Sequence, residues 1–209
     1  MKQNSSKLIY AYWNKVRNGR TAPHRFEIQP AEIPSLLPEI FIAECAGMLN
    51  YRIRLAGTRI CEQFGRELRG VDLLELWEPE DREGLANVLH NIVTDAAVGH
   101  IHFAAIADDE RHADFEMILM PLIHTGASIN RIMGCITALE APFWLGTVPL
   151  TAFELRTVDL VWPDGSPHFL HDTPPPQPPL AISTENSHIA GDGKRQFRVY
   201  EGGLSDQSS

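Results

Sequence analysis

Residues 51–70 read YRIRLAGTRICEQFGRELRG and predict a strand that leads directly into short helices. Apolar residues and arginines alternate at the start of this stretch, which is the pattern of a strand with one buried face. Gly57 ends the strand, and Thr58 can cap the helix that follows because its hydroxyl accepts a free backbone amide. A strand that is followed by short helices between glycines is an arrangement that often lines a cavity.

The composition indicates one domain with extensions. The 209 residues are enough for one sizeable core but few for two. Asp and Glu outnumber Lys and Arg by 27 to 18, which gives a formal net charge of -9. Such a charge repels phosphate backbones and anionic lipid surfaces, so we expect neither a nucleic-acid nor a membrane partner.

The cysteines and the apolar runs indicate a cytoplasmic protein. Cys45, Cys61 and Cys135 have no CxxC spacing, which favours buried free thiols in a reducing compartment over disulfides or a zinc site. We find no apolar run with the length of a signal peptide or of a membrane span. We therefore expect the chain to be cytoplasmic.

Residues 1–38 predict an amphipathic helix and an extended connector. Over residues 7–17 the apolar side chains fall on one side of a helix, which Asn18 and Gly19 end. Residues 21–38 are rich in proline and predict an extended segment. The apolar stripe of the helix needs a surface to cover, either the chain's own sheet or a second copy of the protein.

Residues 39–145 predict the folded domain. A hairpin and the short helices come first, and a long helix then begins at Pro79, where acidic residues favour a helix start. Three further strand patterns follow this helix. The predicted long helix and strands cover residues 79–97 and residues 39–46, 51–56, 100–107, 111–123 and 129–141.

Residues 146–209 predict a C-terminal extension with a short strand at residues 155–161. The proline-rich tail cannot bury enough apolar surface to offset the conformational entropy that it would lose on folding. We therefore expect it to be largely disordered after residue 163. Residues 196–200, QFRVY, either stay flexible with the rest of the tail or add to a sheet edge as a recognition peptide.

The order of these elements resembles that of a PAS domain. FGRELRG at residues 64–70 resembles the glycine-bounded short-helix segment of that family, and residues 12–40 followed by YRIRLAGTRI resemble a single-domain PAS-like family of alphaproteobacteria. The resemblance implies an α+β fold, in which a five-stranded antiparallel sheet carries short helices and one long helix on one face, with the N-terminal amphipathic helix added. It also implies a role in sensing or protein association and supplies no catalytic residues.

The chain departs from the flavin-binding, light-sensing branch of the family, which carries a cysteine in its short-helix segment. Residues 65–74 contain no cysteine and Cys61 lies too early, so we expect no flavin photocycle. We also find no kinase, cyclase or DNA-binding segment. We therefore expect a non-enzymatic bacterial signal-transduction module that a small ligand can gate and that contacts signalling proteins such as sensor histidine kinases or their regulators.

Two histidines in the predicted strand at residues 100–107 raise a cofactor-binding alternative. If the following turn centres on residues 109–110, His102 faces Met117 and His100 lies beside it on the inner side of the sheet. Inward imidazoles could ligate haem or bind a small polar ligand. The other interpretation is that both are ordinary, partly buried histidines, or that a one-residue bulge turns both outward.

His90 on the long helix is the other haem candidate, because haem-binding PAS domains present an axial histidine from that helix. Its neighbours on the helix are small and polar, which indicates a place on the helix flank. A haem- or other cofactor-binding sensor is therefore the alternative function. The leading expectation is no haem, no other cofactor and no metal, because no histidine spacing matches a known zinc pattern.

The faces of the predicted strands and helices indicate a ligand pocket and a homodimer interface. The residues predicted to line the pocket, all of which also suit a plain core, are Ile53, Leu55, Ile60, Phe64, Leu68, His102, Met117 and Leu119. The dimer interface is expected to combine the N-terminal helix with the outer side of the sheet, through Leu8, Tyr12, Trp13, Val16, Ile101, Phe103 and Ile118. A charged residue at Phe103 or Trp13 should then yield monomers.

Overall fold

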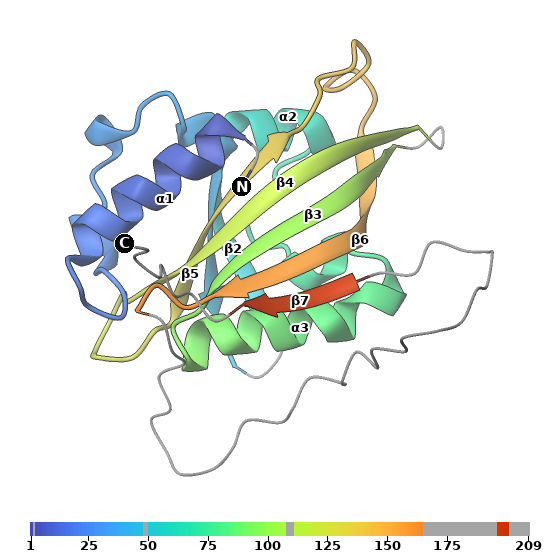
Figure 1. Cartoon of the computed structure of the whole chain (residues 1–209). Helices are drawn as coiled ribbons and strands as arrows, with labels where there is room; N and C mark the ends of the chain where they lie inside the picture. Colours follow the sequence, from blue (N-terminus) through green and yellow to red (C-terminus); the bar gives the residue numbers. More distant parts are fainter. Residues whose placement is uncertain (2, 48–49, 108–110, 165–195, 201–209) are drawn as a thin grey trace, which may run out of the picture.

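The computed structural model describes residues 1, 3–47, 50–107, 111–164 and 196–200, and its architecture is α+β around one curved sheet (Figure 1). The sheet has seven strands in the order β2-β1-β5-β4-β3-β6-β7, all antiparallel except the β6/β7 pair. The predicted α+β class and antiparallel sheet are confirmed, and β6 and β7 extend the sheet beyond the predicted five strands. The strands are β1 (Ile40–Cys45), β2 (Tyr51–Ala56), β3 (Val98–Ala107), β4 (His112–Leu122), β5 (Arg131–Ala138), β6 (Leu150–Val161) and β7 (Gln196–Tyr200).

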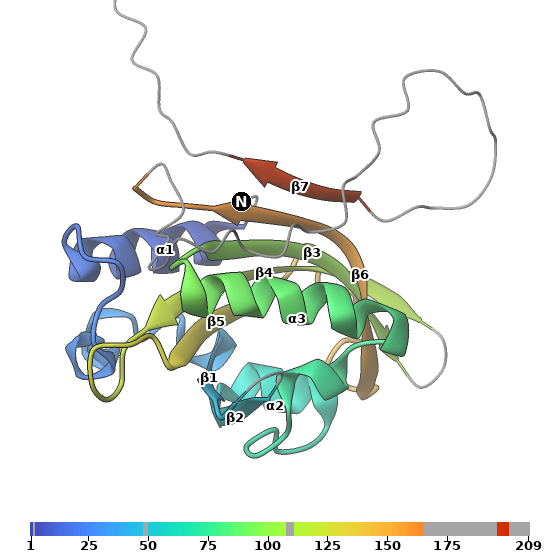
Figure 2. The ribbon, with the colours of Figure 1, turned by 90° about the horizontal axis from the view of Figure 1, so that it is seen from below.

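The helices lie on opposite faces of the sheet (Figure 2). We call the face under α1 (Asn4–Arg17) the outer face, and the face under α2 (Thr58–Phe64), η4 (Leu73–Leu76) and α3 (Pro79–Thr94) the inner face. Three further 3-10 turns, η1 (Arg25–Glu27), η2 (Pro30–Glu32) and η3 (Leu37–Glu39), lie in the connector between α1 and β1.

The long helix α3 begins where the sequence predicts it. Pro79 occupies the first turn, where its missing amide costs nothing, and Glu80 and Asp81 follow in the same turn. Asp81 also accepts a hydrogen bond from the Leu155 backbone amide of β6 at 2.7 Å. This bond attaches the start of α3 to the sheet.

A cluster of aromatic side chains fills the space between the inner face and its helices. The rings of Phe103 and Phe153 lie 4.4 Å apart, and Trp77 lies 5.2 Å from Phe103. Phe115 stacks on Phe103 from the neighbouring strand at 5.4 Å. These side chains are fully buried, so aromatic packing joins β3, β4 and β6 to the helical layer.

A second, smaller core lies between α1 and the outer face. Ile9 and Trp13 of α1 are fully buried against apolar side chains that include Ile118 and Met133. The Trp13 Nε1–H donates a hydrogen bond to the Pro121 carbonyl at 2.9 Å. In this structure α1 therefore packs on the sheet of its own chain.

The β3/β4 register differs by one residue from the prediction. His102 pairs with Glu116, and Phe103 pairs with Phe115. One residue of slip reverses every side chain, because neighbours along a strand point to opposite faces. The prediction that His100 and His102 point inward is therefore wrong. Both lie on the outer face without the one-residue bulge of the other interpretation, because the β3/β4 pairing is unbroken from Gly99 to Ile106.

The C-terminal extension contributes β6, which is longer than the predicted strand at residues 155–161. Residues 196–200 add to the edge of β6 as the parallel strand β7, as the strand-addition interpretation expected. The remaining tail, residues 165–195 and 201–209, lies outside the described residues, so its predicted disorder stays a prediction. The boundaries at residues 38 and 145 also stay predictions, although α1 and β6 both pack with the predicted domain.

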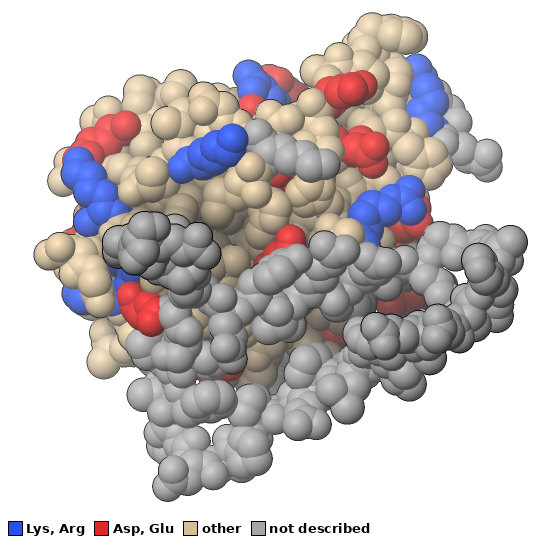
Figure 3. All heavy atoms as spheres, in the orientation of Figure 1, with Lys and Arg blue, Asp and Glu red and all other residues tan. Residues whose placement is uncertain are grey.

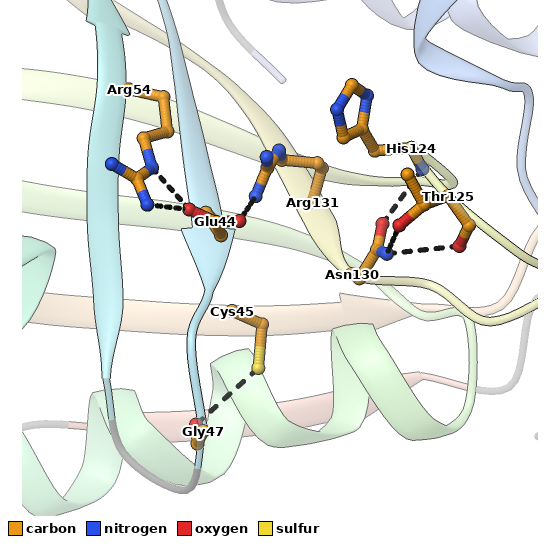
Figure 4. A network of polar contacts seen from close by, with 8 residues as sticks. All are labelled: Glu44, Cys45, Gly47, Arg54, His124, Thr125, Asn130 and Arg131. Carbon is orange, nitrogen blue, oxygen red and sulfur yellow. Dashed lines mark hydrogen bonds and ion pairs between the residues drawn. The ribbon is translucent and has the colours of Figure 1, made fainter.

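An ion-pair network ties three strands together at the β1 end of the sheet (Figure 4). Glu44 of β1 lies between Arg54 of β2 and Arg131 of β5 and pairs with both. The hydrogen bond from Arg131 holds the pKa of the Glu44 carboxyl below its ordinary value, and Arg54 adds to the effect.

No helix in the described part of the chain has both the length and the apolar character needed to cross a membrane.

Candidate functional site

Six of the eight predicted pocket residues come together on the inner side of the sheet. They are buried in the core under α2 and α3, in the order Ile53, Ile60, Phe64, Leu68, Met117 and Leu119. Leu55 is not among them, because a β-bulge at Arg54 shifts the β1/β2 register between Ile42 and Ala43. The bulge turns Leu55 to the outer side, where it is 44% exposed. His102 lies on the outer face because of the register described above.

The predicted pocket is occupied by protein side chains. Trp77, Phe103 and Phe153 lie in mutual contact in the space that the pocket residues surround. A hollow of ≈ 370 Å³ lies elsewhere, between the start of β4 and the segment after β5, and is lined by His112, Ala113, Asp114, Leu139, Glu140, Ala141 and Pro142. That hollow contains no predicted pocket residue.

The predicted dimer interface is divided between the two cores. Ile101 and Phe103 belong to the inner core, so the prediction that they form an outer contact surface is wrong. Tyr12, Trp13 and Ile118 are buried in the outer core of a single chain. Val16 packs partly against this core, and Leu8 is 49% exposed. A charged residue at Phe103 would therefore disrupt the fold rather than an interface.

Polar contacts hold both ends of α1 over the outer face. Gln3, at the start of the helix, donates its backbone N–H to Glu116 Oε1 at 3.2 Å and its side-chain amide to the Leu139 carbonyl at 3.1 Å. At the other end Arg17 pairs with Asp164 at 2.9 Å. The helix is thus held over the sheet by polar contacts at its ends, by the hydrogen bond from Trp13 to Pro121 and by one apolar stripe.

A polar cluster lies beside α1 on the same face. His100 and His102 of β3 both direct Nε2 toward Glu116 Oε2 on β4, at 3.1 and 3.4 Å. Asp159 of β6 lies 3.6 Å from His100 Nδ1. Seen from this side, the visible surface beside α1 consists mainly of residues other than Lys, Arg, Asp and Glu (Figure 3). Glu116 and Asp159 were not predicted as site residues from the sequence, although HxH facing an acid on the next strand is a signal for such a cluster.

The other sequence candidates lie away from this cluster. His90 is exposed on α3, and its carbonyl accepts a hydrogen bond from Thr94. Cys135 is buried under α1, where burial raises the pKa of its thiol to about 12 and keeps it neutral. Burial also raises the pKa of the Cys61 thiol on α2.

A comparison with protein families matches residues 1–137 to a PAS domain family. The chain belongs to this PAS family. PAS domains are generally sensory rather than catalytic, so the sensory assignment is supported at this level. A comparison with curated protein sequences gives no match.

Solved structures similar to this PAS protein are distant in sequence. A light-oxygen-voltage domain studied with a flavin analogue has 12% identity and a TM-score of 0.42, over 53% of this chain and 83% of that chain. The PAS domain of an HTR-like protein from Haloarcula marismortui has 16% identity and a TM-score of 0.40, over 55% and 95%. An RNA-binding light-oxygen-voltage receptor has 14% identity and a TM-score of 0.40, over 60% and 37%.

These matches correct one prediction made from the sequence. The prediction of no cofactor is wrong on this comparison, because light-oxygen-voltage domains are among the matched structures and one was studied with a flavin analogue. The prediction of no nucleic-acid partner stays a prediction, because a structure with 14% identity and a TM-score of 0.40 assigns no partner to this chain.

Proposed function

We propose that the chain is a non-enzymatic, cytoplasmic sensory PAS module that signals through contact with other proteins, and that α1 is the element that changes position. Membership of a generally sensory family supports the first part. Three free cysteines suit a reducing compartment. The observation that carries the proposal is the place of α1, a terminal amphipathic helix that covers an apolar sheet face.

The two faces of the sheet are covered in unequal ways. The inner face belongs to one continuous aromatic core with α2, η4 and α3. The apolar part of the outer face at β4 and β5 is covered by α1 and the connector that follows it. Different parts of a structure open at different free energies, so α1, which is held by one apolar stripe and a small set of polar contacts, can lift while the inner core stays folded.

Displacement of α1 would expose a contiguous apolar surface. Ile118, Met120 and Met133 contribute to this surface, and each is now fully buried. An apolar patch of this kind is suited to a second copy of the chain or to an amphipathic segment of a signalling partner, such as a sensor histidine kinase. A ligand can drive the change only by binding one of the two α1 positions more tightly than the other.

Adjacent aliphatic residues of α1 provide a matched test. Ile9 is fully buried on the outer face, whereas Leu8 is 49% exposed. The Ile9→Asp substitution places a charge in the apolar contact and should release α1. We expect this variant to self-associate at a protein concentration at least ~10-fold lower than the wild type, equivalent to about 1.4 kcal/mol. Light scattering should show its mass rising above the 23.4 kDa of a single chain.

The Leu8→Asp variant is the control, because it adds the same charge to the same helix on the exposed side. It should behave like the wild type. Circular dichroism should show that the sheet stays folded in both variants. If Ile9→Asp keeps its sheet and remains a single chain at every concentration, the outer face is not an association surface and the proposal fails.

A further inference from the structure

Three potential metal ligands converge on the outer face from two neighbouring strands. His100 and His102 are two residues apart on β3, so their side chains leave the same face, and Glu116 is the cross-strand partner of His102. One ligand atom from each of the three residues lies within 4.8 Å of the other two. The strand register, rather than a motif in one segment, brings them together.

The spacing of these atoms suits a small divalent ion. A tetrahedral ion with bonds of about 2.0–2.1 Å places neighbouring ligand atoms about 3.3–3.4 Å apart. Glu116 Oε2 lies 3.1 Å from His100 Nε2 and 3.4 Å from His102 Nε2. The side chains are therefore already close to the separation that shared coordination needs.

The burial of the cluster gives independent support for a ligand. His100 Nε2 is buried and has no hydrogen-bond partner among the described residues, despite its closeness to Glu116. Buried polar atoms nearly always have a partner, and an unpaired one calls for an explanation. Glu116 is fully buried and His102 is partly exposed, with 19% of its side-chain surface accessible. His102 thus gives the ion a route from solvent and leaves room for a water ligand.

The outer atoms of the same side chains are positioned by further contacts. Asp159 Oδ2 lies 3.6 Å from His100 Nδ1, just beyond hydrogen-bond distance, on the side of the ring from which a carboxylate can orient a ligating histidine. The backbone N–H of Gln3 donates to Glu116 Oε1 at 3.2 Å and leaves Oε2 directed toward the histidines. Carboxylates that orient metal-bound histidines are typical of metal sites.

We propose that His100, His102 and Glu116 bind one divalent transition-metal ion. Two imidazoles and one carboxylate with an open fourth position are a donor set that suits Zn²⁺. Asp159 and Gln3 are positioning residues that orient His100 and Glu116. The same ion would be the ligand that the module senses, a step that rests on the proposed function. Gln3 lies at the start of α1 and donates to Glu116, so an ion that fixes Glu116 also holds α1 on the sheet.

Calorimetric titration of the chelator-treated, full-length protein with Zn²⁺ tests the site. We expect one ion per chain, and Co²⁺ in its place should give the visible absorption of a four-coordinate site. His102→Ala and Glu116→Gln should each weaken Zn²⁺ binding by more than the ~10–100-fold expected for Asp159→Asn. His112→Ala is the matched control, because His112 is exposed on β4 outside the cluster, and its affinity should be unchanged.

Failure of the site and failure of the proposed function give different results. Absence of stoichiometric binding by the wild type, or full affinity in folded His102→Ala and Glu116→Gln, overturns the metal site and leaves an ion-pair cluster. If zinc binds but hydrogen exchange of residues 4–17 is the same with and without it, the ion is not the ligand that holds α1. The Ile9→Asp experiment is carried out without metal, so its outcome bears on the proposed function alone.

Discussion

Replacing Phe103 with alanine is expected to lower the free energy of unfolding by about 3–5 kcal/mol, the range for truncating a fully buried aromatic residue. Phe103 is 1% exposed and its ring contacts those of Phe153, Trp77 and Phe115 from three different elements. Its removal leaves a cavity at the centre of the inner core. Urea denaturation followed by circular dichroism measures the change.

Phe143 provides the control for this prediction, because it is 92% exposed. Phe143→Ala should change the free energy of unfolding by less than about 0.5 kcal/mol. Equal effects at the two positions would contradict the assignment of Phe103 to the core. A folded, monomeric Phe103→Asp protein would do so too, and would favour the surface position that the sequence predicts for this residue.

Replacing Trp13 with alanine is expected to weaken the docking of α1 by about 3–5 kcal/mol, because a fully buried indole is lost from the outer core. The substitution also leaves the Pro121 carbonyl without its indole donor. Thermal unfolding should become less cooperative, with loss of helical signal before the sheet melts. Leu8→Ala on the exposed side of α1 should leave the transition unchanged, and a Trp13→Ala transition like that of the wild type would contradict the docking described here.

Local patterns were sufficient to predict most of the fold. The alternation at residues 51–56 gives β2, and the proline and acids at residues 79–81 give the start of α3. The apolar stripe of α1 predicted a helix that covers a sheet face. Each of these features is determined by residues that are close together in the sequence. They can therefore be predicted without knowing how distant segments pair.

The β3/β4 register could not be derived in the same way. Residues 98–107 read VGHIHFAAIA, and both alternating sets contain apolar side chains. Residues of both sets are buried or partly buried in the structure, so neither set is required to be polar. The observed pairing differs from the predicted pairing by one residue. This difference places His100 and His102 on the outer face and Ile101 and Phe103 on the inner face.

The polar cluster depends on this register and on a third strand. His100 and His102 were recognised, but Glu116 and Asp159 join them only through the pairing of β3 with β4 and with β6. The HxH pair stands in the sequence, but the acid that completes the cluster is 14 residues away from His102 and is identified only by the strand pairing. Six of the predicted pocket residues lie in the inner core, and their role in a pocket stays a prediction.

Hydrogen exchange of the wild-type protein tests most directly the claim that α1 is a separately mobile cover of the outer face. The backbone amides of Asn4–Arg17 should exchange through an opening at least ~100-fold more frequent than the unfolding that exposes β4. In that case the helix lifts while the inner core stays intact. Equal protection of α1 and β4, with both exchanging only by global unfolding, would contradict the account.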